Sequence, residues 1–170
     1  SLLTVYAEHQ SERLKHTAGV AMLALALARR MLPGESERHR MLALAGLLHD
    51  VGELYIDPAY MRPGTPLGPP EWRHVASHPV VGERVLRNMP GAGKEIASAV
   101  LHHHERLDGF GYPRGVQGAA LPLNGQILAA AEWLMALIEN SMTPMARGSV
   151  APKLVPREFS RELTEAMTAA

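Results

Sequence analysis

Residues 102–113 read HHHERLDGFGYP, so three consecutive histidines stand directly before Glu105. A chain has little structural use for three successive imidazoles, whereas a metal cluster needs several neutral nitrogen donors close together. The glycines and the proline that follow predict an ordered turn after the histidines. We therefore place the centre of an active site in this segment.

On both sides of this segment the sequence is helical. Residues 2–32 have apolar residues at helical spacing, among them Leu14, Ala18, Met22 and Leu25, and Pro33-Gly34 ends this helix. Ser36 is the predicted N-cap of a second helix that reaches His49. Proline and glycine predict loops over 57–70 and 109–122. Further helices are expected over 71–77, 79–88, 93–103, 123–140 and 156–170. No useful strand alternation is present, so the predicted class is all-α.

Length and composition limit the classes of protein. We expect a catalytic domain over 1–140, with 1–15 as a candidate continuation of an upstream signalling helix, and a tail with a terminal helix over 141–170 of the same domain. Seventeen Lys and Arg balance seventeen Asp and Glu, which argues against a nucleic acid polymer as partner. The chain has no cysteine, which excludes thiolate sites and agrees with a cytoplasmic location. Its most apolar stretch, residues 20–28, is too short for membrane insertion.

Five separate segments offer metal-binding side chains at the ends or on the inner faces of predicted helices. They are Glu12 with His16, His49 with Asp50, His78, His103 with His104, and Glu132. Taken singly, each has an ordinary structural interpretation, such as a solvated ion pair or a histidine at a helix end. Together they favour a metal cluster, because buried groups of this kind are costly without partners.

The chemistry of these donors narrows the cofactor. Imidazole and carboxylate ligands without sulfur favour iron, manganese or zinc, and eight candidate groups are too many for one ion. We expect two or three divalent ions, with iron or manganese first. Two ions about 3.5 to 4 Å apart suit phosphoester cleavage, because they can generate a bridging hydroxide and stabilise the attacking and leaving oxygens.

Over about residues 12–139 the sequence resembles the HD-GYP family, the branch of the HD superfamily that hydrolyses the bacterial messenger cyclic di-GMP. Residues 103–113 are similar to its HHE-x-x-DG-x-GYP signature, His49-Asp50 to its HD doublet, and His78-Pro79 with Gly82 to its HP-x-x-G element. The resemblance implies an HD-superfamily helical bundle with a metal cluster at its centre. It also implies a metal-dependent phosphodiesterase acting on cyclic di-GMP through a metal-bridging hydroxide.

The resemblance further implies which residues bind the ions. They are His16, His49, Asp50, His78, His103 and His104, with Glu12 at the position of an additional ligand in members with three metals. Glu132 stands where the family has an aspartate. Asp50 and Glu53 are the candidate catalytic residues. We expect Glu105 and Asp108 to hold the loop and orient ring nitrogens without binding metal, and Gly111 and Tyr112 to shape the substrate pocket.

Two departures from the family pattern concern the substrate phosphates. Glu53 stands where the pattern has a lysine, and it could bind a metal or repel the substrate. The basic pair that usually follows the last ligand helix is reduced to Arg147, and Arg62 replaces a usual lysine in the loop of 56–72. Arg62 and Arg147 are therefore the predicted basic contacts to the substrate.

These departures leave two alternatives to cyclic di-GMP hydrolysis. One is a catalytically degenerate signalling module that binds metal or nucleotide, and the other is a hydrolase of another cyclic dinucleotide. In either case we expect an upstream sensor or receiver domain, and the length of the first helix motivates a homodimer. The remaining histidines, His9, His39, His74 and His102, are predicted to be surface residues.

Overall fold

The computed structural model describes residues 2–62, 64–140 and 157–168, and the side chains of these except residues 2–10 and 140. Its helices are α1 (Leu2–Met31), α2 (Ser36–Leu48), η1 (Val51–Tyr55), α3 (Pro69–Val75), α4 (His78–Arg87), α5 (Gly93–Leu101), η2 (Gly118–Ala120), α6 (Leu123–Asn140) and α8 (Arg161–Thr168). Within these ranges no β-strand forms, and the predicted all-α class is confirmed. None of the described helices has the length and hydropathy needed to span a membrane.

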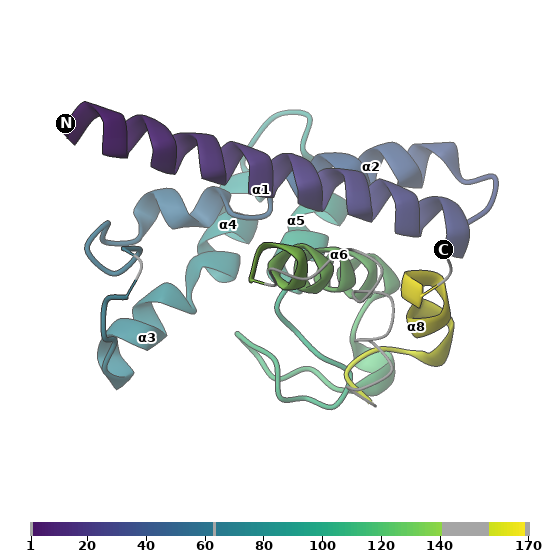
Figure 1. Cartoon of the computed structure of the whole chain (residues 1–170). Helices are drawn as coiled ribbons and strands as arrows, with labels where there is room; N and C mark the ends of the chain where they lie inside the picture. Colours follow the sequence, from purple (N-terminus) through teal and green to yellow (C-terminus); the bar gives the residue numbers. More distant parts are fainter. Residues whose placement is uncertain (1, 63, 141–156, 169–170) are drawn as a thin grey trace.

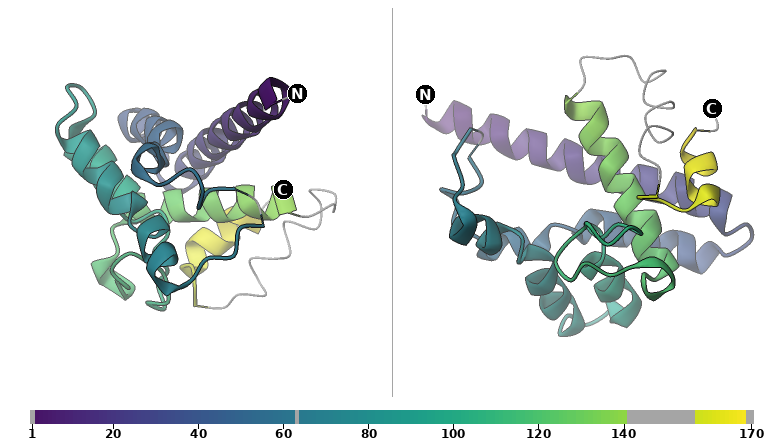
Figure 2. Two further views of the ribbon diagram at one scale, coloured as in Figure 1. Left: turned by 90° about the vertical axis from the view of Figure 1, so that its left-hand side faces the viewer. Right: turned by 90° about the horizontal axis from the view of Figure 1, so that it is seen from below.

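The long helix α1 forms one side of the bundle, and α2 returns beside it in the opposite direction (Figure 1). Helix α6 packs across α1, while α5 lies between α2, α4 and α6 (Figures 1 and 2). The backbones of α1 and α2 approach closely at Gly46, where an added Cβ would lie 2.6 Å from the Cα of Ala21. The first turns of α1 project beyond the other helices (Figure 1).

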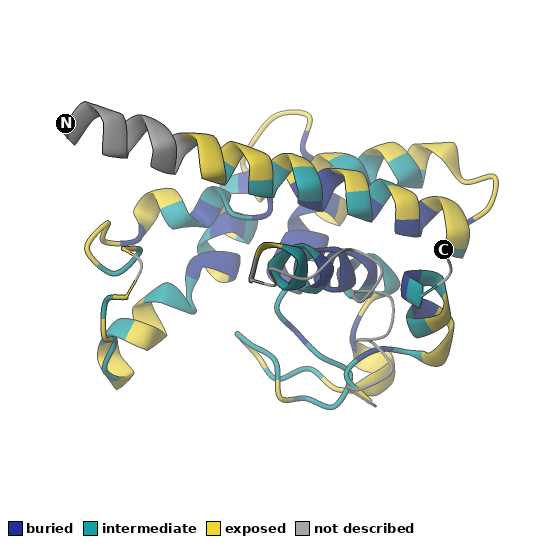
Figure 3. Cartoon of the chain, in the orientation of Figure 1, coloured by how far each residue is buried: buried dark blue, intermediate teal, exposed yellow. Residues whose placement is uncertain are grey.

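The core lies where α1, α2, α5 and α6 meet (Figure 3). Its fully buried residues include Val20 and Ala24 of α1. Leu14 and Met22, two of the residues that predicted this helix, lie on a second stripe of α1 and are 70% and 73% exposed. Both stripes have helical spacing, but only the face with small residues fits against the neighbouring backbones. Periodicity alone did not distinguish the two faces.

Two helix starts differ from the sequence prediction. Helix α2 begins at Ser36 itself, and Glu35 occupies the N-cap position without a side-chain capping bond, so the predicted N-cap was wrong. Helix α3 begins at Pro69, two residues earlier than expected. Proline is tolerated in a first turn because the N–H that it lacks has no partner inside the helix. Of the terminal helix predicted over 156–170, the structure shows α8, and the described residues 157–160 before it are not helical.

Candidate metal centre

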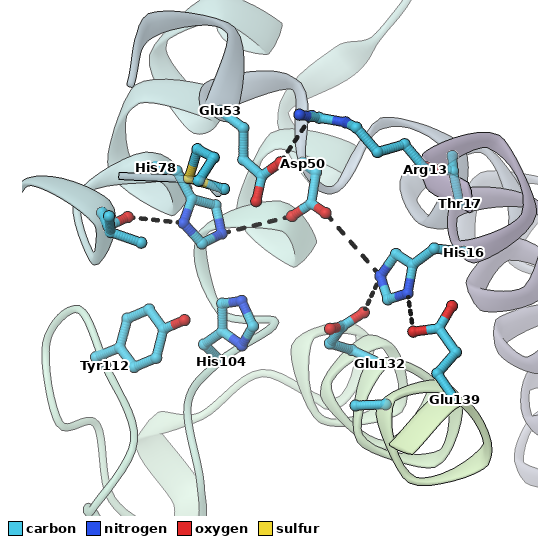
Figure 4. A pocket seen from close by; sticks show the side chains of 13 residues that line it. Arg13, His16, Thr17, Asp50, Glu53, His78, His104, Tyr112, Glu132 and Glu139 are labelled. Atoms are coloured by element: carbon cyan, nitrogen blue, oxygen red, sulfur yellow. Dashed lines mark hydrogen bonds and ion pairs between the residues drawn. The ribbon is translucent and has the colours of Figure 1, made fainter. Parts of the chain in front are cut away.

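Each of the five predicted segments contributes at least one residue to the wall of a cavity of about 390 Å³. Side chains from α1, α4, α6 and the segment after α2 point toward this cavity (Figure 4). The fold brings them together by the ends of helices: His49 directly follows α2, His78 begins α4, and His103 closely follows α5. The backbone at Gly52 packs closely against the start of α4, because a Cβ at Gly52 would collide with the carbonyl oxygen of His78.

The donors form two neighbouring groups. The α5-side group consists of Asp50, His78, His103 and His104, and the α1-side group consists of His16, His49 and Glu132. Within each group one ligand atom per residue lies within 4.8 Å of the others. Seven of the eight predicted metal ligands therefore belong to these two groups, and Glu12 does not.

Asp50 lies between the two groups (Figure 4). Its Oδ1 is 3.5 Å from Nε2 of His78 and 3.7 Å from Nε2 of His103. Its Oδ2 is 3.0 Å from Nε2 of His49 and 4.0 Å from Nε2 of His16. The two oxygens of one carboxylate thus face different groups, which is the arrangement of a residue that can bridge two cations.

Main-chain carbonyls fix the orientation of three of the rings. Nδ1 of His49 donates to the oxygen of Gly46 at 2.7 Å, and Nδ1 of His78 donates to the oxygen of Val75 at 2.9 Å. His103 makes the same contact with Val100 at 2.5 Å. A carbonyl can only accept, so Nδ1 carries the hydrogen and Nε2 of the neutral ring directs a lone pair toward the cavity.

The Nε2 atoms of these rings lie close to other acceptors without a hydrogen between them. Nε2 of His78 and Nε2 of His103 are 3.2 Å apart, although both rings already use Nδ1 as donor. Nε2 of His49 is buried without a hydrogen bond, while carboxylate oxygens of Asp50 and Glu132 lie 3.0 and 3.3 Å away. Such approaches require a proton or a metal cation among the donors. The residues present, all nitrogen and oxygen donors, therefore fit divalent metal ions.

His16 differs from the other rings because both of its nitrogens face carboxylates. Nε2 is 3.0 Å from Oε2 of Glu132, and Nδ1 is 2.9 Å from Oε2 of Glu139 (Figure 4). Sequence reasoning missed Glu139. The available signal was its spacing of seven residues from Glu132, which puts both on one face of α6.

The two groups also differ in electrostatics. The hydrogen bond to Glu132 raises the pKa of His16 to about 9, against the effect of burial. By contrast, burial lowers the pKa of His78 to about 4, and burial together with His103 lowers the pKa of His104 well below its usual value. Without metal, the α1-side group therefore holds a proton at neutral pH, while His78 and His104 are neutral.

The neighbouring imidazole rings lower the pKa values of two carboxyl groups, Asp50 and Glu132. Burial opposes ionisation of Asp50, yet His49 and His103 hold its pKa well below the usual range. The pKa of Glu132 is also held well below its usual value, because its hydrogen bond to His16 and the nearby ring of His49 outweigh burial. Both side chains are therefore anionic and ready to balance positive charge.

Tyr112 lies at the wall of the cavity, and its contact with substrate stays a prediction. Its ring stacks on His104 with 4.5 Å between centroids and an interplanar angle of 21°. The half-exposed ring of Trp72 meets Tyr112 edge-on at 5.6 Å. Gly111 lies against the backbone of residues 104–106, where an added Cβ would be 2.5 Å from the oxygen of His104. Its role is thus to let the loop pack closely behind the histidines.

Glu105 is fully buried and holds the loop, accepting hydrogen bonds from the backbone N–H of Arg114 at 2.7 Å and of Val116 at 2.9 Å. Asp108 accepts from the N–H of Phe110 at 3.0 Å. The contacts of these two carboxylates are with the loop backbone, whereas main-chain carbonyls orient the rings of His49, His78 and His103. At a helix end the carbonyl three residues earlier is available for this purpose.

Several predicted residues lie away from the cavity. Glu12 is 71% exposed and pairs with Lys15 at 2.7 Å, while Arg62 is exposed and does not line the cavity. Arg147 lies outside the described residues. Of the histidines expected at the surface, His74 is exposed. His102 is buried, because its Nδ1 donates to the oxygen of Ser98 at 2.7 Å and its Cβ fills the space beside Gly125.

Two further histidines complete this comparison. His39 is partly buried, with Nε2 2.7 Å from the oxygen of Leu32 just after α1, so it lies against the end of that helix instead of standing free at the surface. His9 lies in α1, and its side chain is outside the described ones.

Arg13 and Glu53 complete the cavity wall. Nη2 of Arg13 donates to Oε2 of Glu53 at 2.7 Å, which connects α1 to η1 (Figure 4). Burial and the neighbouring Asp50 carboxylate raise the pKa of Glu53 to about 7. Sequence reasoning did not select Arg13, although its position three residues before His16 places both on one side of α1.

Comparison with protein families gives a match to the HD domain over residues 2–150. A cyclic di-GMP phosphodiesterase of Pseudomonas aeruginosa is 35% identical over 144 residues, which cover 84% of this chain and 34% of that protein. A 3'3'-cGAMP-specific phosphodiesterase of Vibrio cholerae is 33% identical over 140 residues, covering 80% and 30%. The chain spans about a third of the length of these curated relatives.

Two solved structures share the fold. The HDG"Y"P protein Bd1817 of Bdellovibrio bacteriovorus aligns with a TM-score of 0.71 and 19% identity, over 91% of this chain and 51% of that one. The HD domain of the L. monocytogenes phosphodiesterase PgpH, in complex with cyclic di-AMP, aligns with a TM-score of 0.66 and 19% identity, over 91% and 85%. The predicted helical bundle with donors at its centre is confirmed.

Proposed function

Since this chain belongs to the HD domain family and is similar to its HD-GYP phosphodiesterases, as the sequence predicted, we propose that it is a metal-dependent phosphodiesterase that hydrolyses cyclic di-GMP. The observation that carries this proposal is the convergence of imidazole Nε2 atoms and carboxylate oxygens on one cavity. The name of the relative from P. aeruginosa supplies the substrate class.

For the cofactor we propose two divalent ions: the α5-side group would hold one and the α1-side group the other, and Asp50 offers an oxygen to each group. Iron or manganese fits these nitrogen and oxygen donors. When bound, such ions lower the pKa of water so that hydroxide is available at neutral pH, and they offset negative charge on a phosphoryl group. Main-chain carbonyls hold the rings of His49, His78 and His103 in place before the substrate arrives, which lowers the cost of reorganisation.

Residues outside the two donor groups have separate roles at the cavity. The face of Tyr112 already stacks on His104, and the edge of Trp72 lies beside it, so this aromatic corner can contact a purine base. Glu105 keeps the loop folded behind the histidines. Glu53, the second candidate catalytic residue, lies on the wall with Oε2 bonded to Arg13, and its catalytic role stays a prediction.

The test is hydrolysis by the purified protein loaded with iron(II) or manganese(II). We expect cyclic di-GMP to be converted to the linear dinucleotide or to mononucleotides, resolved by chromatography, and chelation to abolish conversion. A protein that retains its metals and leaves cyclic di-GMP intact would contradict the proposal. That result would favour the alternative of a degenerate signalling module.

A second candidate substrate is 3'3'-cGAMP, because a relative of similar identity is named for it. Both molecules contain two phosphodiester bonds and differ in one base, so the metal groups are compatible with either. Parallel rates on cyclic di-GMP, 3'3'-cGAMP and cyclic di-AMP separate these candidates. A kcat/KM for one of the latter two that exceeds that for cyclic di-GMP would reassign the substrate.

We also propose the cellular setting expected from the sequence: a cytoplasmic bacterial signalling protein with an upstream sensor or receiver domain. The length of α1 motivates a homodimer of the full-length protein. Light scattering on the full-length protein tests this, and monomeric behaviour would remove the dimer.

A further inference from the structure

We propose that Arg13 binds a phosphate of the substrate and that Glu53 holds its guanidinium in position. This inference rests on the proposed function, because it assigns a contact to the same cyclic dinucleotide. It replaces the sequence expectation that Arg62 supplies the basic contact in the described part of the chain.

The charges around the cavity motivate the proposal. Four carboxylates line it, from Asp50, Glu53, Glu132 and Glu139, whereas Arg13 is the one arginine or lysine among the lining residues of the described chain. Asp50 and Glu132 belong to the metal groups, so bound ions would offset their charge. An anionic substrate also needs a positive group outside the metal ligands, and Arg13 is the residue in place to supply it.

The position of Arg13 fits this role. It lies one turn before His16 on α1, so it stands beside the α1-side group. Its side chain is 37% exposed while that of Glu53 is 15% exposed, so the pair is anchored on the inner side and open on the other. A guanidinium carries five N–H donors in a planar fork, so one bond to Glu53 leaves donors for a phosphate.

A purely structural role for the pair explains less. Partly exposed ion pairs contribute little to stability, so the Arg13–Glu53 bond is a weak device for joining α1 to η1. The same bond is well suited to orienting the guanidinium of Arg13, because Glu53 fixes one edge of the planar group. Arg62, by comparison, is exposed and lies outside the cavity lining.

The principal experiment compares Arg13→Ala with Lys15→Ala in metal-loaded protein. Lys15 is on the same helix, carries the same charge and pairs with Glu12 away from the cavity, so it controls for the general loss of positive charge. For Arg13→Ala we expect cyclic di-GMP to bind about 10- to 100-fold more weakly by calorimetry, with KM raised more than kcat is lowered. Metal content should stay that of the wild type, and Arg13→Lys should recover part of the affinity.

The outcomes separate this inference from the proposed function. Wild-type affinity in Arg13→Ala, or an equal loss in Lys15→Ala, overturns the role of Arg13. A wild type that binds cyclic di-GMP through Arg13 without hydrolysing it overturns the phosphodiesterase and keeps the inference. A metal-loaded wild type that binds no cyclic dinucleotide overturns both.

A double-mutant cycle tests the positioning role of Glu53. Glu53→Gln should weaken binding several-fold, and the variant with both Arg13→Ala and Glu53→Gln should bind no more weakly than Arg13→Ala alone, because Glu53 acts through Arg13. Additive losses overturn that role. Loss of bound metal in Glu53→Gln by elemental analysis also overturns it, since Glu53 would then be a ligand.

Discussion

In the α5-side group, the rings of His78 and His103 are oriented by main-chain carbonyls three residues earlier. The α1-side group has one ring of this kind, His49, and one ring, His16, that is oriented by the side chain of Glu139. The first arrangement follows from short local segments at helix ends. The second exists only when α1, α6 and the end of α2 have packed together. Local contacts thus orient both of these α5-side rings, whereas the α1-side group also depends on tertiary structure, through His16.

The largest effect is expected from Asp50→Asn, which removes the carboxylate shared by the two groups. An amide keeps the shape but carries no charge and offers a single oxygen. Changes in the partners that merely orient ligands cost about 10- to 100-fold, so we expect a loss of more than about 100-fold in kcat/KM. Elemental analysis should show less metal from both groups, and retention of the full metal content would contradict a shared carboxylate.

His103→Ala and His16→Ala should divide the centre. Each variant removes one ligand from one group only, so each should lose about half of the bound metal if each group holds one ion. Metal stoichiometry measured on folded protein, with circular dichroism as the control for folding, checks this. If either substitution strips all metal, the groups are not independent.

The pH dependence of metal binding should differ between these two variants. His103→Ala keeps the α1-side group, where the pKa of His16 of about 9 means that a proton must leave before a metal binds. Its metal affinity should therefore rise by about tenfold per pH unit from pH 6 to 8. His16→Ala keeps the α5-side group, where the pKa of His78 is about 4, and its affinity should change little. Titrations with manganese(II) measure both slopes, and equal slopes would contradict the electrostatic difference.

Glu139→Gln should have the smallest effect and should act on one group. The amide oxygen can still accept from Nδ1 of His16, so the ring keeps its orientation but loses a neighbouring negative charge. We expect a loss of up to about tenfold in metal affinity, at the low end of the range for such partners. The Mn(II) affinity of the α5-side group, isolated in His16→Ala, should be the same with and without Glu139→Gln. A change there would mean that Glu139 acts on both groups.

The same division explains what the sequence could predict. The local sequence is enough to select His103 and His104 as site residues, because they follow an apolar helix and precede a turn-forming segment. Glu139 and Arg13 were missed, because nothing local reveals that α6 and η1 pack beside one end of α1. Periodicity predicted the all-α class, but it did not predict which face of α1 is buried. Its small residues are selected by the close approach of other backbones.

Helix α1 carries both Arg13 and His16, and its first turns project beyond the rest of the bundle. A shift of this helix by one residue would move His16 by about 1.5 Å along the axis and turn it by about 100°. Either displacement would carry the imidazole away from Glu132 and Glu139. Gly19 packs against Met135 of α6, and Gly46 against Ala21, so close contacts resist such a slip. The donor set therefore depends on the register of α1: all of its side chains come together in one register, and His16 leaves the set when the helix shifts by one residue.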